Sequence, residues 1–255
     1  MKVGIIGGSG FYSIGEEIEK KEISTPFGKV NVRILQIDDT DHEIIFLPRH
    51  GDSHSIPPHA INYRANIYAL FSEGIDHILT TNAVGSCKNH LMPGNYLLPH
   101  DFLDFTDGRP KTFFDGQFSV KTRKKGELKE VVHTDISEPF SPFLRKKILE
   151  TAQKMGVYVH NGGTIAVFNG PRFETPAEIK MISNFADVVG MTTVPEVVLS
   201  KEIGVEYQTM AVITNKAAGF QSEVTHNEVI ELFNEKIEQV AELLITTAKN
   251  IILEK

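Results

Sequence analysis

The chain has 255 residues, with 26 Lys and Arg against 33 Asp and Glu, so its formal net charge is −7 with His neutral. This acidic balance argues against a nucleic-acid partner, because binding to a polyphosphate backbone is driven by basic side chains that displace counterions. With 41% hydrophobic and 23% charged residues, the composition is that of an ordinary globular protein rather than a disordered one.

The single cysteine, Cys87, excludes an internal disulfide and a multi-cysteine zinc site, and it suits a reducing compartment. The apolar stretches are short compared with the ~20 residues that a membrane-spanning helix needs. The sequence starts on strand-like residues, without the apolar region of a signal peptide. We therefore expect a cytoplasmic protein with no membrane partner.

Short apolar runs alternate with helix-like segments along the chain. The predicted strands are residues 3–6, 30–37, 43–47, 77–81, 187–190 and 207–214. The predicted helices are residues 61–71, 143–155, 176–184, 195–203 and 225–253. This alternation predicts an α/β sheet covered by helices on both faces, with ligands at the carboxyl ends of strands.

No linker divides the sequence. The least core-like stretch is 104–131, where TDGRPKTFFDG is followed by the basic run KTRKKGELKE. Strand and helix signals resume on both sides of it, so we interpret it as a surface excursion within one domain that covers residues 1–255.

The first motif, Gly7-Gly8-Ser9-Gly10, follows the first predicted strand. Small residues let backbone N–H groups approach an anion, and the Ser9 hydroxyl adds a donor. The match to a dinucleotide fingerprint is poor, because Ser13 stands where a third glycine or alanine belongs. A plain tight turn remains the alternative.

The second motif, PRHGDSH at 48–54, offers Arg49 and His50 as donors for phosphate oxygens. The alternatives are a solvated loop or, less favoured, a metal site formed with His54 and His59, for which no acidic third ligand is obvious. The third motif, NAVGS at 82–86, permits close approach to a ligand but fits a simple turn equally well. Cys87 beside it is interpreted as a small buried hydrophobe rather than a nucleophile.

The later half carries three further motifs after predicted strands: NGPRFET at 169–175, GMTTVPE at 190–196 and ITNKAAG at 213–219. Pro176 and Pro195 are well placed as first-turn helix residues. Taken singly, Glu174 fits a helix N-terminus, Met191 fits the core and Asn215 fits a turn. Three such motifs in series at strand ends favour a site.

The motifs GGSG, PRHG, NYRANIYAL, NAVGS, NGPRFETPAEI, GMTTVPEVVL and ITNKAAG occur in this order. Together they closely resemble the family of purine nucleoside phosphorylases and methylthioadenosine phosphorylases over nearly the whole chain. The resemblance implies one α/β domain with a mixed, partly barrel-like sheet flanked by helices, assembled as a trimer or as a hexamer of two trimers. It also implies phosphorolysis of a purine nucleoside to a free base and a pentose 1-phosphate, with phosphate as co-substrate and no metal or organic cofactor.

By the same resemblance, the phosphate site comprises Ser9, Arg49, His50, Asn82, Ala83 and Thr192. The ribose is contacted by Met191, His226 and His133. The purine is contacted by Phe173, Glu174, Asn215 and Ala217. The candidate catalytic residues are Asn215, Glu174 and His50. Phosphate stabilises the oxocarbenium-like sugar, and donors aimed at the purine stabilise the leaving group.

Base choice follows from two of these positions. A 6-oxopurine presents an N1–H donor and acceptors at O6 and N7, so a carboxylate and an amide match it, and Glu174 and Asn215 supply them. Relatives that use 6-aminopurines carry a small hydroxyl residue at the Glu174 position and aspartates at the Asn215 and Ala217 positions. Because those acids are missing here, a 6-aminopurine would leave its amino donor without a carboxylate acceptor. Such a mispairing costs orders of magnitude in rate. We therefore expect hypoxanthine and guanine as the bases.

The 5′ substituent gives conflicting signals. NYRANIYAL, TDGRPKTFFDG and the VVHTDISEPF segment that contains His133 resemble the methylthioadenosine branch. His226, in contrast, matches a histidine that hydrogen-bonds a 5′-hydroxyl in nucleoside phosphorylases, although a histidine on the polar face near a helix start is the alternative. We favour inosine and guanosine, with S-methyl-5′-thioinosine, and then methylthioadenosine, as alternatives.

The stretch 117–132 is longer than in the relatives it most resembles, and in the family this neighbourhood reaches the adjoining subunit's active site.

Two other function classes compete with a phosphorylase. A nucleoside hydrolase needs an activated water, often on calcium, and the sequence lacks an Asp-rich metal cluster. The other is a non-enzymatic nucleotide-binding module. Phosphate-dependent release of base from inosine separates the three.

Overall fold

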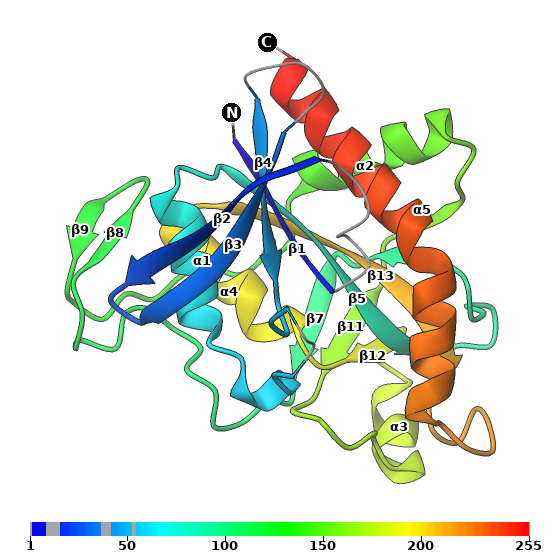
Figure 1. The fold of residues 1–255 in the computed structure, drawn as a ribbon. Coiled ribbons are helices and arrows are strands. Elements are labelled where there is room, and N and C mark those ends of the chain that lie inside the picture. The colour runs from blue at the N-terminus through cyan, green and yellow to red at the C-terminus, as the bar shows by residue number, and fades with distance from the viewer. Residues whose placement is uncertain (1, 9–15, 37–41, 53–54, 255) are drawn as a thin grey trace.

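The computed structural model describes residues 2–8, 16–36, 42–52 and 55–254 (Figure 1). The strands are β1 (Val3–Gly7), β2 (Glu16–Thr25), β3 (Gly28–Gln36), β4 (Glu43–Pro48), β5 (His77–Ser86), β6 (Tyr96–Leu98), β7 (Asp101–Asp104), β8 (Val120–Thr122), β9 (Gly126–Leu128), β10 (Val159–Asn161), β11 (Thr164–Val167), β12 (Val188–Gly190) and β13 (Glu206–Lys216). The helices are α1 (Tyr63–Ser72), α2 (Pro142–Lys154), α3 (Pro176–Ile182), α4 (Thr193–Ile203) and α5 (His226–Leu253). Within the described ranges, no helix is both long and apolar enough to cross a membrane.

Most strands belong to one mixed sheet with the order β10-β6-β13-β5-β1-β4-β3-β2. Its centre is parallel, because β1 runs parallel to β4 and β5, and β13 runs parallel to β5. At the end of β5 the sheet branches, since Gly85 and Ser86 pair with the antiparallel strand β12, which is followed by β11 and β7. The predicted α/β class with a mixed sheet is confirmed.

Helices cover both faces of this sheet, as predicted (Figure 1). The helices α2 and α5 pack on one face, in a cluster that contains Val3 and Ile5 of β1. The helices α1 and α4 pack on the other face, in a cluster that contains Ile6. Successive residues of a strand point to opposite faces, so a strand covered on both sides is apolar throughout, as β1 is.

All the predicted strands and helices fall on elements of the structure, but several short strands and β2 were missed. Among the described strands, β2 pairs with β3 alone, so it is an edge strand, and its charged residues Glu19, Lys20 and Glu22 are exposed. Side-chain caps explain the starts of α1, α2, α3 and α5. Thr175, for example, accepts from the backbone N–H of Glu178 and forms a capping box ahead of Pro176.

The prediction that 104–131 is a surface excursion was wrong for its first half. Arg109, Phe113 and Phe114 are buried, and Phe113 packs against the rings of Phe27 and Tyr68. The aromatic pair therefore belongs to the core beneath α1, although polar and glycine residues surround it in the sequence. The second half is an exposed hairpin, β8–β9, that contains the basic run.

Candidate active site

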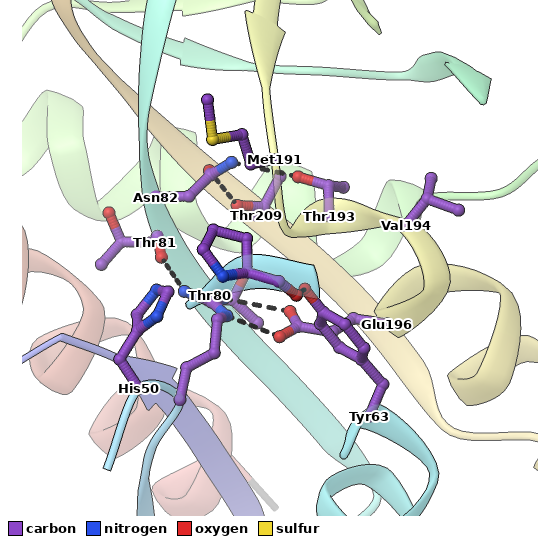
Figure 2. Close-up of polar contacts among 12 residues, drawn as sticks. His50, Tyr63, Thr80, Thr81, Asn82, Met191, Thr193, Val194, Glu196 and Thr209 are labelled. Atoms are coloured by element: carbon purple, nitrogen blue, oxygen red, sulfur yellow. Dashed lines mark hydrogen bonds and ion pairs between the residues drawn. The ribbon is translucent and has the colours of Figure 1, made fainter. Parts of the chain in front are cut away.

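The candidate residues gather where the parallel strands end. Gly7 of β1 lies beside Pro48 of β4, and Arg49 follows directly. Asn82 lies on β5, and Met191 follows β12. Figure 2 shows His50, Asn82, Met191 and Glu196 of α4 in one region at this edge. The carboxyl ends of the central strands therefore meet at one edge, which is where open α/β sheets bind ligands.

Arg49 is buried and forms an ion pair. Its Nε and Nη2 donate to the Glu196 carboxylate at 2.5 and 3.0 Å, and its Nη1 donates to the carbonyl of Thr81 at 2.8 Å. Burial alone would lower the pKa of Arg49, but the adjacent carboxylate outweighs burial and raises that pKa. These bonds engage three of the five N–H groups of a guanidinium.

Glu196 was missed by the sequence prediction, although it is fully buried at the start of α4. The Tyr207 hydroxyl donates to Glu196 Oε2 at 2.8 Å. With that proton engaged, the Thr80 hydroxyl donates to Tyr207 Oη at 3.1 Å. The sequence did hold a signal for Glu196, because this carboxylate stands between apolar residues in VPEVVL. Such a pattern indicates a buried charge, and a buried charge requires a partner.

The polar side chain of Asn82 is held within the protein. Its Oδ1 accepts from Thr209 at 2.9 Å, and its Nδ2 donates to Thr193 at 3.1 Å (Figure 2). Thr192 precedes α4 and is buried, but its hydroxyl does not cap the helix. Val194 is extended, at φ −106° and ψ 127°, so regular helix begins only at Pro195.

His50 is half-buried beside Arg49, and its ring contacts the loop that follows. Nδ1 lies 2.8 Å from the carbonyl oxygen of Ile56, so Nδ1 carries a proton and donates it. Ser9 lies outside the described residues, as does His54.

Glu174 is a buried carboxyl, with 8% of its surface exposed. Its Oε1 is buried and has no hydrogen-bond partner among the described residues. Burial is the main reason why its pKa is raised from 4.5 to about 7. Phe173 next to it is half-buried. This arrangement leaves an acceptor oxygen available to a donor that enters the site.

Asn215 is buried on β13, past a register shift between Ile213 and Asn215 in its pairing with β5. Its Oδ1 accepts from Thr214 at 2.9 Å, and its Nδ2 donates to the carbonyl of Lys216 at 2.8 Å. Gly85 lies against it, because a Cβ there would be 3.2 Å from Asn215 Nδ2. The shift turns the amide towards the end of β5.

Ala217 and Cys87 belong to one apolar cluster beside Asn215. Burial raises the pKa of Cys87 to about 12, and the Glu174 carboxyl adds to that rise. The interpretation of Cys87 as a buried hydrophobe is confirmed. The charge of Glu174 thus affects Cys87, which lies in the same apolar cluster as Ala217.

The three predicted ribose residues, Met191, His226 and His133, lie on different segments, which are the turn after β12, the start of α5 and the stretch before α2. Met191 is half-buried, and its carbonyl accepts from Arg109 Nη1 at 2.7 Å. His226 is the exposed first residue of α5. His133 is exposed and lines a cavity of about 300 Å³ whose lining contains no other predicted site residue. Across the part of the chain that the structure describes, no group of three or more His, Cys, Asp or Glu is placed to hold a metal.

Comparison with known proteins gives a consistent picture. Residues 2–249 match the phosphorylase superfamily. A 6-oxopurine nucleoside phosphorylase from Pyrococcus furiosus is 42% identical over 247 residues, covering 96% of this chain and 91% of that relative. An S-methyl-5′-thioadenosine phosphorylase from Pyrococcus abyssi is 41% identical over 245 residues, covering 95% and 90% respectively.

The fold comparison agrees. The solved structure of a methylthioadenosine phosphorylase from Schistosoma mansoni in complex with adenine superposes with a TM-score of 0.90. It is 34% identical in sequence and covers 100% of this chain and 93% of its own.

Proposed function

The chain belongs to the phosphorylase superfamily, and from this premise we propose that it catalyses phosphorolysis of 6-oxopurine nucleosides. Inosine and guanosine are cleaved by phosphate to the free base and ribose 1-phosphate, a reaction of purine salvage. The enzyme is a pentosyltransferase. Phosphate is a co-substrate, and no cofactor takes part.

Glu174 is the observation that carries the choice of base. Its buried Oε1, without a partner among the described residues, is an acceptor that the protein leaves unused. A 6-oxopurine supplies the N1–H donor that this acceptor lacks. A 6-aminopurine has no hydrogen on N1, so Glu174 would stay unpaired or have to hold its proton, and unpaired buried groups are costly.

The phosphate site is proposed at the ends of β1, β4 and β5. The ion pair with Glu196 fixes the Arg49 guanidinium, and two of its five N–H groups are left for an anion. His50, Thr192 and the backbone around Asn82 and Ala83 complete the site. Ser9 is added from the sequence alone.

In the reaction, a phosphate oxygen bonds to C1′ as the C1′–N9 bond breaks, and the purine keeps the electron pair. The anionic phosphate stabilises the developing positive charge on the ribose, which Met191 positions. The amide of Asn215 donates towards N7 and O6, where negative charge accumulates, while Glu174 holds N1–H and Phe173 and Ala217 line the ring. These interactions strengthen in the transition state and so accelerate the reaction.

The alternative substrate is S-methyl-5′-thioinosine, with methylthioadenosine less favoured. It is supported by relatives named S-methyl-5′-thioadenosine phosphorylase at nearly the same identity. His226 supports the 5′-hydroxyl instead, because a polar imidazole suits a hydroxyl better than a thioether.

We place the protein in the cytoplasm, as one domain over residues 1–255 that assembles into a trimer or a hexamer of two trimers. In such an assembly, His133 reaches the 5′ position of a neighbouring subunit. Its exposed position away from the other site residues is compatible with this role.

The test is hypoxanthine release from inosine with and without phosphate, followed by a panel of guanosine, adenosine, methylthioinosine and methylthioadenosine. We expect release that requires phosphate and a preference for inosine and guanosine. Phosphate-independent release would indicate a hydrolase, and no release from any nucleoside would indicate a binding module. A preference for the methylthio compounds would select the alternative substrate.

A further inference from the structure

Arg109 is a buried cation that joins two turns of the site. We propose that Arg109 is a positioning residue, whose guanidinium holds the turn after β11 and the turn after β12 in one arrangement. Its Nη1 donates to the carbonyls of Met191 at 2.7 Å and Val194 at 2.9 Å. Its Nη2 donates to the carbonyl of Asn169 at 2.8 Å. Only the catalytic consequence of this role rests on the proposed function.

The two turns begin side by side and then separate. Val167 of β11 pairs with Gly190 of β12, and the Phe168 N–H donates to the Gly190 carbonyl at 3.0 Å. Beyond that bond, the segment after β11 leads to Phe173 and Glu174. The segment after β12 leads to Met191 and α4. Arg109 therefore supplies the connection where the ladder between the strands ends.

A second contact shows how closely the turns fit. Gly170 has a φ of +61°, and a Cβ there would lie 2.5 Å from Met191 Sδ. The Met191 side chain thus packs directly on the first turn. Asn169 is also tied to the segment before Arg109, because its Nδ2 donates to the Asp107 carbonyl at 3.0 Å. The position of Met191 depends on both turns together.

Only an arginine meets this geometry. The guanidinium is a planar fork whose two terminal nitrogens point at different segments, whereas a lysine has one nitrogen and reaches one of them. The hydrogen-bond partners of Arg109 are all carbonyl oxygens, and its guanidinium lies over the Tyr63 ring at 5.2 Å. Burial lowers the pKa of Arg109. Arg109 is thus buried without a carboxylate partner, and its role lies in the carbonyl oxygens that its guanidinium bonds on both turns.

The test is Arg109→Lys, compared with Arg123→Lys as a control. Arg123 also donates to a backbone carbonyl, that of Ile75, and also lies over a ring, that of Phe71 at 5.7 Å, but it is ion-paired with Asp76 at 3.0 Å. It is not one of the candidate site residues. The ¹³C methyl resonance of Met191, with Met210 in the core as internal reference, reports the turn without requiring any activity.

We expect Arg109→Lys to shift or broaden the Met191 resonance and leave that of Met210 in place, and to lower kcat/KM for inosine at least tenfold. Arg123→Lys is expected to leave the Met191 resonance unmoved and kcat/KM within threefold. An unchanged Met191 resonance in folded Arg109→Lys would overturn the proposal. A displaced resonance in a protein whose wild type does not cleave inosine would instead reject the proposed function and keep the positioning role.

Discussion

Replacing Glu174 by glutamine removes a titrating carboxyl and keeps an acceptor oxygen. The pKa of Glu174 is raised from 4.5 to about 7, mainly by burial. In the empty site, the carboxylate is therefore half formed near pH 7. A hydrogen bond to a charged group is worth ~1.5–3 kcal/mol, which is about 10- to 150-fold in Kd. We expect Glu174→Gln to bind hypoxanthine 10- to 150-fold more weakly at pH 8 (~1.5–3 kcal/mol).

The pH dependence follows from the same values. As pH falls below about 7, wild-type Glu174 takes up a proton, and the Kd for hypoxanthine rises about tenfold per pH unit. The rise ends when the neutral carboxyl binds no better than the amide, about one to two pH units lower. The Kd curves of the wild type and Glu174→Gln should thus converge towards pH 5, with the variant flat throughout.

Calorimetry with hypoxanthine and no phosphate is the assay, because phosphate itself titrates near neutral pH. Glu178→Gln is the control, since the ion pair with Arg172 lowers the pKa of Glu178 to about 2 and that carboxyl does not titrate in this range. Because the Glu178 charge helps to raise the pKa of Glu174, this variant should keep the pH dependence with its midpoint at a lower pH. A pH dependence that survives in Glu174→Gln, or an unchanged affinity at pH 8, would refute the assignment.

Stability supplies a second readout. The raised pKa of Glu174 means that its neutral form stabilises the fold, a contribution that is complete below pH 4.5 and is lost as pH rises through about 7. Holding the carboxylate in the buried site costs about 3 kcal/mol at pH 8. At pH 8, the free energy of unfolding of Glu174→Gln should therefore exceed that of the wild type by up to about 3 kcal/mol. The variant should accordingly unfold at a higher denaturant concentration.

Asn215→Asp should lower kcat/KM for inosine at least tenfold and maintain or raise any adenosine activity, because a carboxylate repels O6 and N7 but accepts from a 6-amino group; inosine turnover near the wild type would contradict this. His226→Val should raise the ratio of methylthioinosine to inosine turnover, and an unchanged ratio would make His226 a surface residue. Glu196→Gln should destabilise the protein by ~3–5 kcal/mol, because it leaves buried Arg49 uncompensated. Phosphate should then raise the Tm of this variant more than that of the wild type, and equal shifts would show that Arg49 does not meet the anion.

The sequence predicted the sheet centre and the helices well, because their residues are apolar with clear periods. β1 and β5 are buried along nearly their whole length, and α3 begins at a capping box followed by Pro176. β2 was missed because edge strands need no apolar face, and Phe113 because a local pattern cannot show that a loop folds back beneath α1.

At the candidate site, the sequence indicated individual residues in motifs but not the contacts that join residues far apart in the chain. Glu174 and Asn215 stand in recognisable motifs at strand ends. Glu196 and Arg49 are paired across 147 positions, and Arg109 bonds carbonyls that lie 59 to 85 positions away. Backbone carbonyls carry no side-chain signature, so no spacing in the sequence announces such contacts.

The net charge of −7 does not describe the site, because the relevant charges are buried and few. Arg49 and Glu196 neutralise each other. Asp104 attracts Arg109, but the Asp104 carboxylate is bonded to Lys111 at 2.8 Å, and Arg109 itself bonds only carbonyl oxygens. Arg109 therefore leaves one positive charge among these groups, and the buried Glu174 carboxylate offsets part of it as pH rises through about 7. A buried charge without a counter-ion costs several kcal/mol, so a positive balance among these buried groups supports the phosphate site that we propose.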